Sequence, residues 1–237
     1  MKSYKHLFFD LDHTLWDYDA NASETLIEIY QNFDMSKYGV TDPERFRDIF
    51  FQENDKLWAA LNVGKIDKFY LRNNRFRIVM EAANADMSGV NDDLLIELNN
   101  TFLTSCSRKK KVIDGAFELL DFCQDRFGLH IITNGFEDVQ SIKLESSGLD
   151  KYFDKVITSE KAGHKKPNPG IYTYALKHSG AELDHSLMIG DNLNTDIKGA
   201  ISFGMDQVYF NPAKIKHDEQ VTREITQLSE LMGLLGG

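Results

Sequence analysis

The sequence LFFDLDHTL at residues 7–15 joins a short apolar run to a pair of aspartates. A continuous run of aromatic and aliphatic side chains is typical of a strand covered on both faces. Asp10 and Asp12 follow this strand at its carboxyl end, where open α/β sheets bind their ligands. Carboxylates this close together need a cation or shifted pKa values. One of them could attack a phosphorus atom while the other exchanges a proton, although two aspartates capping a turn would give the same pattern.

Four later segments repeat the short apolar run, and each follows a stretch with helical features. The runs lie at residues 129–133, 155–158, 186–190 and 207–210, and the helical stretches at 115–127, 138–148, 169–180 and 196–204. Several of these stretches end on a glycine suited to a left-handed helix cap. Strands that alternate with helices pair in parallel through right-handed crossovers. The sequence therefore predicts a doubly wound, Rossmann-like α/β sheet.

Residues 16–107 have a different sequence pattern, with several amphipathic segments and no convincing alternation of apolar and polar residues typical of a strand. One helix is expected to start at Asp42-Pro43, where a capping side chain precedes a ring with a preset φ. Further helices are expected at residues 67–83 and 91–102. We therefore expect a helical domain at residues 16–107, inserted into an α/β core made of residues 1–15 and 108–237.

The composition excludes several classes of protein. The 237 residues carry a net charge of −10, and 42% of them are hydrophobic, which is unlike a disordered or fibrous chain. The acidic balance disfavours nucleic-acid binding through overall charge. No apolar run approaches the roughly 18 residues that span a bilayer, and the N-terminus is interpreted as untargeted. Cys106 and Cys123 suggest reduced thiols, so we expect a cytoplasmic protein with no nucleic-acid or membrane partner.

Two further strand ends carry groups suited to an anion. Thr133, Asn134 and Gly135 offer a hydroxyl and backbone N–H groups for phosphate oxygens, and the glycine allows close approach. Lys166 directly precedes Pro167, which restricts the lysine backbone and helps to fix the ammonium near developing negative charge. An ordinary turn and a surface lysine are the alternative interpretations.

A fourth strand end adds two more acids. Asp191 follows Gly190 at the end of an apolar run, and Asp196 lies five positions further on. Asp191 can complete an oxygen-ligand set for Mg²⁺ with a carboxylate of the first strand. Asp196 could ligate directly, hold a metal-bound water or cap a helix. Because accidental turns would rarely align at four strand ends, the sequence predicts one shared site.

The four motifs together resemble those of the haloacid dehalogenase superfamily, whose phosphatases combine DxDxT, a strand-end Thr or Ser, a lysine and GDxxxxD. The resemblance implies that Asp10 is a nucleophile forming an aspartyl-phosphate and that Asp12 is the general acid and base. It also implies Mg²⁺ held by Asp10, the Asp12 carbonyl and Asp191. Asp196 would then lie outside the direct ligands or reach the ion through water.

The same resemblance implies that Thr133, Asn134 and Lys166 bind the substrate phosphate. One position departs from the commonest family pattern, because His13 stands where a glycine is usual after the second motif aspartate. We expect this substitution to be tolerated.

The length and position of the insertion resemble the helical cap of subclass C1. Within that group, the sequence TNGF at residues 133–136 and residues such as Trp58 and Arg75 are similar to the pyrimidine 5′-nucleotidases. Trp58 could stack on a base and Arg75 could pair with an anion. Their default interpretations are a packed core aromatic and a solvated helix residue.

The leading hypothesis is a Mg²⁺-dependent phosphatase, monomeric or homodimeric, that acts on nucleoside 5′-monophosphates with a pyrimidine or modified base. An alternative is a phosphatase for another small metabolite such as a sugar phosphate or phosphoglycolate. A 2-haloacid dehalogenase is disfavoured by Asp12, since halide displacement needs no acid at that position. A non-catalytic module that binds phosphorylated ligands is the remaining alternative.

Overall fold

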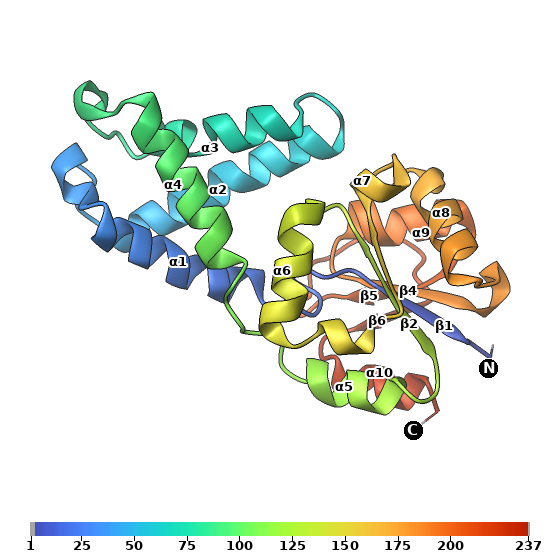
Figure 1. Ribbon diagram of the computed structural model, residues 1–237. Coiled ribbons are helices and arrows are strands. Elements are labelled where there is room, and N and C mark those ends of the chain that lie inside the picture. Colours follow the sequence, from blue (N-terminus) through green and yellow to red (C-terminus); the bar gives the residue numbers. More distant parts are fainter. Residues whose placement is uncertain (1–2, 237) are drawn as a thin grey trace. The chain divides into compact units, whose positions relative to one another are not determined.

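The computed structural model describes residues 3–236, and these form two compact units. The sheet unit comprises the described parts of residues 1–18 and 110–237, and the helical unit comprises residues 19–109 (Figure 1). The junctions lie slightly beyond the expected 15/16 and 107/108 because the two linkers pair within the sheet unit. Trp16 forms an antiparallel bridge with Val112, and the Asp17 N–H donates to the Lys111 carbonyl.

The sheet unit contains six parallel strands in the order β3-β2-β1-β4-β5-β6. They are β1 (His6–Phe9), β2 (Gly128–Thr133), β3 (Lys155–Thr158), β4 (Ser186–Gly190), β5 (Asp206–Phe210) and β6 (Arg223–Ile225). The predicted doubly wound sheet is confirmed. The edge strand β6 was not predicted because only Ile225 of its three residues is buried, so it has no apolar run.

Helices cover both faces of the sheet, with α8 and α9 together on one side and α5 and α10 together on the other (Figure 1). The helices of this unit are α5 (Ala116–Cys123), α6 (Glu137–Ser147), α7 (Ser159–Ala162), α8 (Pro169–Ser179), α9 (Lys198–Phe203) and α10 (Ser229–Leu234). Short helical turns lie at η3 (Asp150–Tyr152) and η4 (Leu183–His185). Phe8, Ile132 and Met188 from three strands pack against Ile171 and Tyr172 of α8, which forms a buried core on that face.

Helix α9 begins later than predicted, at Lys198, because a π-helical segment, η5 (Leu193–Ile197), precedes it. The Asn192 side chain caps this segment by accepting from the N–H groups of Asn194 and Thr195. The segment places Asp196 inside its turn, fully buried, instead of at the start of an α-helix.

The helical unit is built from α1 (Tyr18–Asn32), η1 (Met35–Tyr38), α2 (Pro43–Asn62), α3 (Lys68–Ala82), η2 (Met87–Gly89) and α4 (Asp92–Cys106). The side chains of Asp42, Asp67 and Asn91 cap the N-termini of α2, α3 and α4 by accepting hydrogen bonds from backbone N–H groups. Interlocking aromatic rings, including those of Phe50 and Phe102 at 4.7 Å between centroids, fill its core. Across residues 3–236, no helix is long and apolar enough to cross a membrane.

Arg75 lies inside this helical core, so its interpretation as a solvated helix residue is wrong. It is 2% exposed, and its guanidinium donates to Asn99 at 2.8 Å and lies 4.7 Å from the centre of the Phe102 ring. The planar guanidinium can stack on aromatic faces and donate in its own plane, which makes this burial possible. Trp58 is partly buried.

A histidine pair joins neighbouring strands in the sheet unit. His6 Nδ1 of β1 and His130 Nε2 of β2 lie 3.0 Å apart in a hydrogen bond, which requires a neutral ring on at least one side. Burial, and then the charge of His6, lowers the pKa of His130 from 6.5 to about 4, while Asp154 opposes and Lys155 reinforces this shift.

Protonation of His130 should therefore destabilise the fold. Its contribution to stability is complete above pH 6.5 and is lost as the pH falls towards 4. The substitution His130→Leu should reduce the fall in unfolding free energy between pH 7 and pH 5 by about 1 kcal/mol. Urea unfolding at both pH values measures this difference, and replacement of the exposed His178 by leucine should leave the wild-type fall unchanged. An identical fall in all three proteins would contradict the assignment.

Candidate functional site

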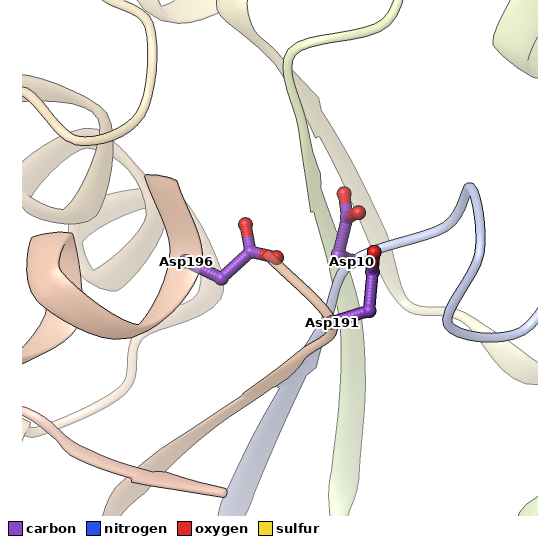
Figure 2. A group of neighbouring side chains, drawn as sticks. All are labelled: Asp10, Asp191 and Asp196. Carbon is purple, nitrogen blue, oxygen red and sulfur yellow. The ribbon is translucent and has the colours of Figure 1, made fainter. Parts of the chain in front are cut away.

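Three carboxylates meet at the carboxyl edge of the sheet. Asp10 follows β1 and Asp191 follows the adjacent β4, while Asp196 reaches the same place from the π-helical segment (Figure 2). One oxygen atom from each side chain lies within 4.8 Å of the other two. The sequence prediction that these acids share one edge therefore matches their observed positions.

Gly190, the last residue of β4, makes room for this cluster. A Cβ atom at this position would lie 2.3 Å from Asp196 Oδ2, so any larger residue would displace that carboxylate. Asp196 Oδ2 accepts from the Asn192 N–H at 3.0 Å, and Oδ1 accepts from the Thr195 hydroxyl at 3.3 Å. Asp196 is thus held by its own turn.

Lys166 ties the acids together. Its Nζ donates to Asp10 Oδ1, to Asp196 Oδ1 and to the carbonyl oxygen of Ile132, each at 2.7 Å. These three contacts use all three ammonium hydrogens. Lys166 is only 1% exposed, so it is not the surface lysine of the alternative interpretation.

The cluster carries more negative charge than Lys166 can balance. Burial, opposed by Lys166 and reinforced by Asp196 and Asp191, raises the pKa of Asp10 to about 8. Burial followed by the charge of Asp196 raises the pKa of Asp191 to about 7, despite its hydrogen bond from Thr14 at 2.9 Å. A divalent cation would relieve this mutual repulsion.

The donor set fits a hard cation. Carboxylate oxygens are the ligands that Mg²⁺ prefers, and the three acids lie close enough to share one ion. Both oxygens of Asp196 already accept hydrogen bonds, one of them from Lys166, whereas Asp191 accepts from the Thr14 hydroxyl and from its own backbone N–H. Asp10 and Asp191 are therefore the better direct ligands, and Asp196 is better placed to orient Lys166.

Thr133 is arranged to donate a hydrogen bond. Its Oγ1 accepts from the Gly135 N–H at 2.9 Å and from Gln140 Nε2 at 3.0 Å, so both lone pairs are in use. Within residues 3–236, no acceptor is recorded for its hydroxyl hydrogen, which leaves that hydrogen available to an anion.

Asn134 acts on Lys166 through its side chain. Its Nδ2 donates to the Lys166 carbonyl at 2.9 Å, and its Oδ1 accepts from the Lys166 N–H at 2.8 Å. The amide therefore fixes the backbone of the lysine loop, where the Lys166–Pro167 peptide bond is cis. This geometry favours a positioning role over direct phosphate contact by the side chain.

Asp12 lies apart from the three-acid cluster, in a different environment. Lys143 Nζ approaches Asp12 Oδ1 at 2.5 Å, and Gln140 Nε2 donates to Asp12 Oδ2 at 2.9 Å. Burial alone would raise the pKa of Asp12, but the ion pair with Lys143 outweighs it and lowers the pKa below its usual value. Two aspartates only two residues apart thus have pKa values shifted in opposite directions.

Several residues that contact the site aspartates are not predicted by the sequence patterns. Lys143 and Gln140 both lie on the buried face of α6, and the local sequence pattern predicts a role for neither. The buried residues of α6 are Gln140, Lys143, Leu144 and Ser147, so this face has no apolar stripe that would predict its burial. Thr14 enters the sequence prediction only as the threonine of the DxDxT motif, yet its hydroxyl donates a hydrogen bond to Asp191. His13 has a φ of 63°, in the left-handed region that favours glycine, which explains why a glycine suits this turn.

Comparison with known proteins identifies the class. The model of the haloacid dehalogenase-like hydrolases matches residues 4–204, and the chain belongs to this family. The chain is 31% identical to the pyrimidine 5′-nucleotidase PynA of Streptococcus pneumoniae over 98% of its own length and 95% of PynA. It is also 31% identical to the pyrimidine 5′-nucleotidase YjjG of Escherichia coli, over 97% and 96% of the two chains.

A solved structure agrees with this assignment. The HAD hydrolase YfnB of Bacillus subtilis, bound to magnesium, superposes with a TM-score of 0.86 at 29% identity and covers 99% of each chain. The family resemblance drawn from the four motifs is confirmed, as is the prediction of an enzyme of the hydrolase class.

Removal of Lys166 should unbalance the three acids. The substitution Lys166→Met leaves buried carboxylates without their ammonium partner and should lower the free energy of unfolding at pH 7 by about 3 kcal/mol. Lys161, whose ion pair with Glu137 spans 3.3 Å at the surface, provides the control, and Lys161→Met should change it by less than about 1 kcal/mol. Urea unfolding measures both changes. Equal losses of unfolding free energy in the two variants would show that the buried contacts of Lys166 contribute no more to stability than a surface ion pair.

Proposed function

We propose that this protein is a Mg²⁺-dependent phosphomonoester hydrolase, a 5′-nucleotidase acting on pyrimidine or modified nucleoside monophosphates through an aspartyl-phosphate. The observation that carries the proposal is the contrast between Asp10, which lies in the three-acid cluster, and Asp12, which lies outside it with its own cationic partner. Two carboxylates in divided roles need different environments. Because the raised pKa lies at Asp10, this assignment requires a divalent cation at the three-acid cluster to keep Asp10 ionised as the nucleophile.

In the first step, an Asp10 oxygen attacks the phosphorus atom, and the ester bond to the leaving oxygen breaks. The electron pair of that bond stays on the leaving oxygen, which takes a proton from the carboxylic-acid form of Asp12, so an alcohol and an aspartyl-phosphate result. Lys143 favours the carboxylate form in the free protein, so Asp12 must take up this proton before the ester bond breaks. In the second step, a water molecule attacks the phosphorus and gives a proton to Asp12. The bond to Asp10 then breaks, which releases phosphate and restores both carboxyl groups.

The remaining groups would hold and neutralise the phosphate. The free hydroxyl hydrogen of Thr133 is placed to donate to a phosphate oxygen, while Lys166 keeps Asp10 in position and offsets charge at the nucleophile. Asp10 and Asp191 would hold Mg²⁺, together with the Asp12 carbonyl. The bound ion would supply Lewis-acid stabilisation of charge on the transferring group.

The nucleotide preference rests on the relatives. PynA and YjjG, each 31% identical over nearly the whole chain, are pyrimidine 5′-nucleotidases. A glyceraldehyde 3-phosphate phosphatase also aligns over 99% of the chain, at 28% identity, so the preference rests on the higher identity to the nucleotidases. A 2-haloacid dehalogenase remains disfavoured, since such a reaction would give no role to the donors that surround Asp12.

A substrate panel tests both the chemistry and the preference. Phosphate release should be faster from uridine and thymidine 5′-monophosphates than from sugar phosphates or phosphoglycolate, and EDTA should abolish it. Activity should return on addition of MgCl₂ because carboxylate oxygens such as those of the three-acid cluster are ligands that Mg²⁺ prefers. Full activity in EDTA would overturn the metal dependence, and faster release from sugar phosphates would overturn only the nucleotide assignment.

Replacement of the nucleophile gives the second test. Asp10→Asn retains the shape of the side chain but removes its nucleophilic oxygen, so phosphate release should fall by at least roughly 10³-fold. The matched amide substitution at the exposed Asp138 should leave turnover unchanged. Substantial turnover by the Asp10 variant would exclude an aspartyl-phosphate on that residue.

A further inference from the structure

Two side chains on the same face of helix α6, one turn apart, contact Asp12. Gln140 and Lys143, three residues apart, share a helix face, and we call this pair the Asp12 clamp. Lys143 holds Oδ1 at 2.5 Å and Gln140 holds Oδ2 at 2.9 Å, so both carboxylate oxygens of Asp12 have a donor. The carboxylate plane is thereby fixed.

Lys143 is itself held in place. Its side chain is 7% exposed, and its Nζ lies 4.5 Å from the centre of the Trp16 ring and 5.6 Å from that of Tyr18. A cation over aromatic faces has an attraction that supplements the ion pair. Trp16 is fully buried and donates its backbone N–H to the Leu11 carbonyl, so the ring is anchored to the same turn that carries Asp12.

Gln140 connects Asp12 to the predicted phosphate-binding threonine. Its Nε2 donates to Asp12 Oδ2 and, at 3.0 Å, to Thr133 Oγ1, while Oε1 has no partner among the described residues. The two donated bonds therefore decide the orientation of the amide. A Cβ atom at Gly135 would lie 1.5 Å from Gln140 Nε2, so the glycine keeps open the space that this bridge occupies.

The geometry points to Gln140 and Lys143 as positioning residues that orient Asp12 for proton exchange with the leaving oxygen of the substrate. This inference rests on the proposed function. A buried ion pair is weak evidence for stability, because desolvation offsets its attraction. The Asp12 side chain is 23% exposed whereas that of Lys143 is 7% exposed, so the carboxylate is the accessible member of the pair. Each held oxygen keeps a second lone pair that can carry a proton.

The effect of the clamp on the reaction rate should depend on how much the leaving oxygen of the substrate needs a proton. When the ester bond breaks, its electron pair passes to the leaving oxygen. A nucleoside 5′-oxygen leaves as an alcohol and takes its proton from Asp12, whereas p-nitrophenolate is a stable anion that can leave without one. A misoriented Asp12 would therefore slow the nucleotide reaction and spare the nitrophenyl ester. A general loss of structure would slow both.

The test compares kcat/KM for uridine 5′-monophosphate and p-nitrophenyl phosphate, since kcat/KM includes the step in which the ester bond breaks. In Lys143→Met, which keeps an unbranched stem over Trp16, the nucleotide value should fall roughly 10-fold to 100-fold. The p-nitrophenyl value should fall less than about threefold. Lys143→Arg, which keeps the charge and the donors, should recover most of the nucleotide activity.

Three controls separate the possible outcomes. Lys151→Met removes a lysine that lies 4.8 Å from the Tyr152 ring and should change neither substrate. Gln140→Leu removes the other half of the clamp and should slow the nucleotide reaction more than the nitrophenyl reaction, with a smaller loss shared by both because Thr133 also loses a hydrogen bond. This variant keeps the inference testable if Lys143→Met does not fold. In an Asp12→Asn background, Lys143→Met should add little further loss, because the residue that it orients is gone.

The failures of the two ideas are distinguishable. If the wild-type protein hydrolyses neither ester, the proposed function fails. If the wild type is active but the clamp variants lose both activities equally, or lose neither, the inference about the clamp is overturned while the proposed function stands.

Discussion

The arrangement of the site depends on the burial of three carboxylates around one ammonium group. Asp10 and Asp191 come from adjacent parallel strands, whose carboxyl ends lie at the same edge, and Asp196 is brought there by the π-helical segment. Lys166 satisfies the cluster in part, with hydrogen bonds to Asp10 and Asp196. The remaining repulsion appears as raised pKa values at Asp10 and Asp191, and a divalent cation is the natural counter-charge. The excess charge is thus the physical basis for proposing a metal.

The same turn separates two chemical roles over a distance of two residues. Asp10 faces other carboxylates, whereas Asp12 faces the ammonium of Lys143 and the amide of Gln140. Since the pKa of a carboxyl group depends on its neighbours more than on its place in the sequence, two aspartates in one turn can have pKa values shifted in opposite directions. Turn geometry makes this separation possible, and His13 contributes by adopting a left-handed conformation between Asp12 and Thr14.

The sequence predicted the strand ends well because an apolar run that stops in a polar group has a simple physical meaning. All five runs became strands of one parallel sheet, and the acids at residues 10, 191 and 196 meet at its edge. Contacts made by helices were harder to predict. The clamp on Asp12 depends on which face of α6 packs against the sheet, and the burial of Arg75 depends on asparagines from α2 and α4. Such pairings lie far apart in the chain, so local patterns do not reveal them.

Every group assigned to phosphoryl transfer belongs to the sheet unit, including the clamp residues and the aromatic rings that hold Lys143. The proposed bond breaking therefore uses side chains of the sheet unit. Within the sheet unit, Gln140 joins Thr133 and Asp12, the groups proposed for phosphate binding and proton transfer, through one amide nitrogen. Their separation is consequently set by a rigid helix and not by a flexible loop, which is the condition under which positioning contributes most to rate.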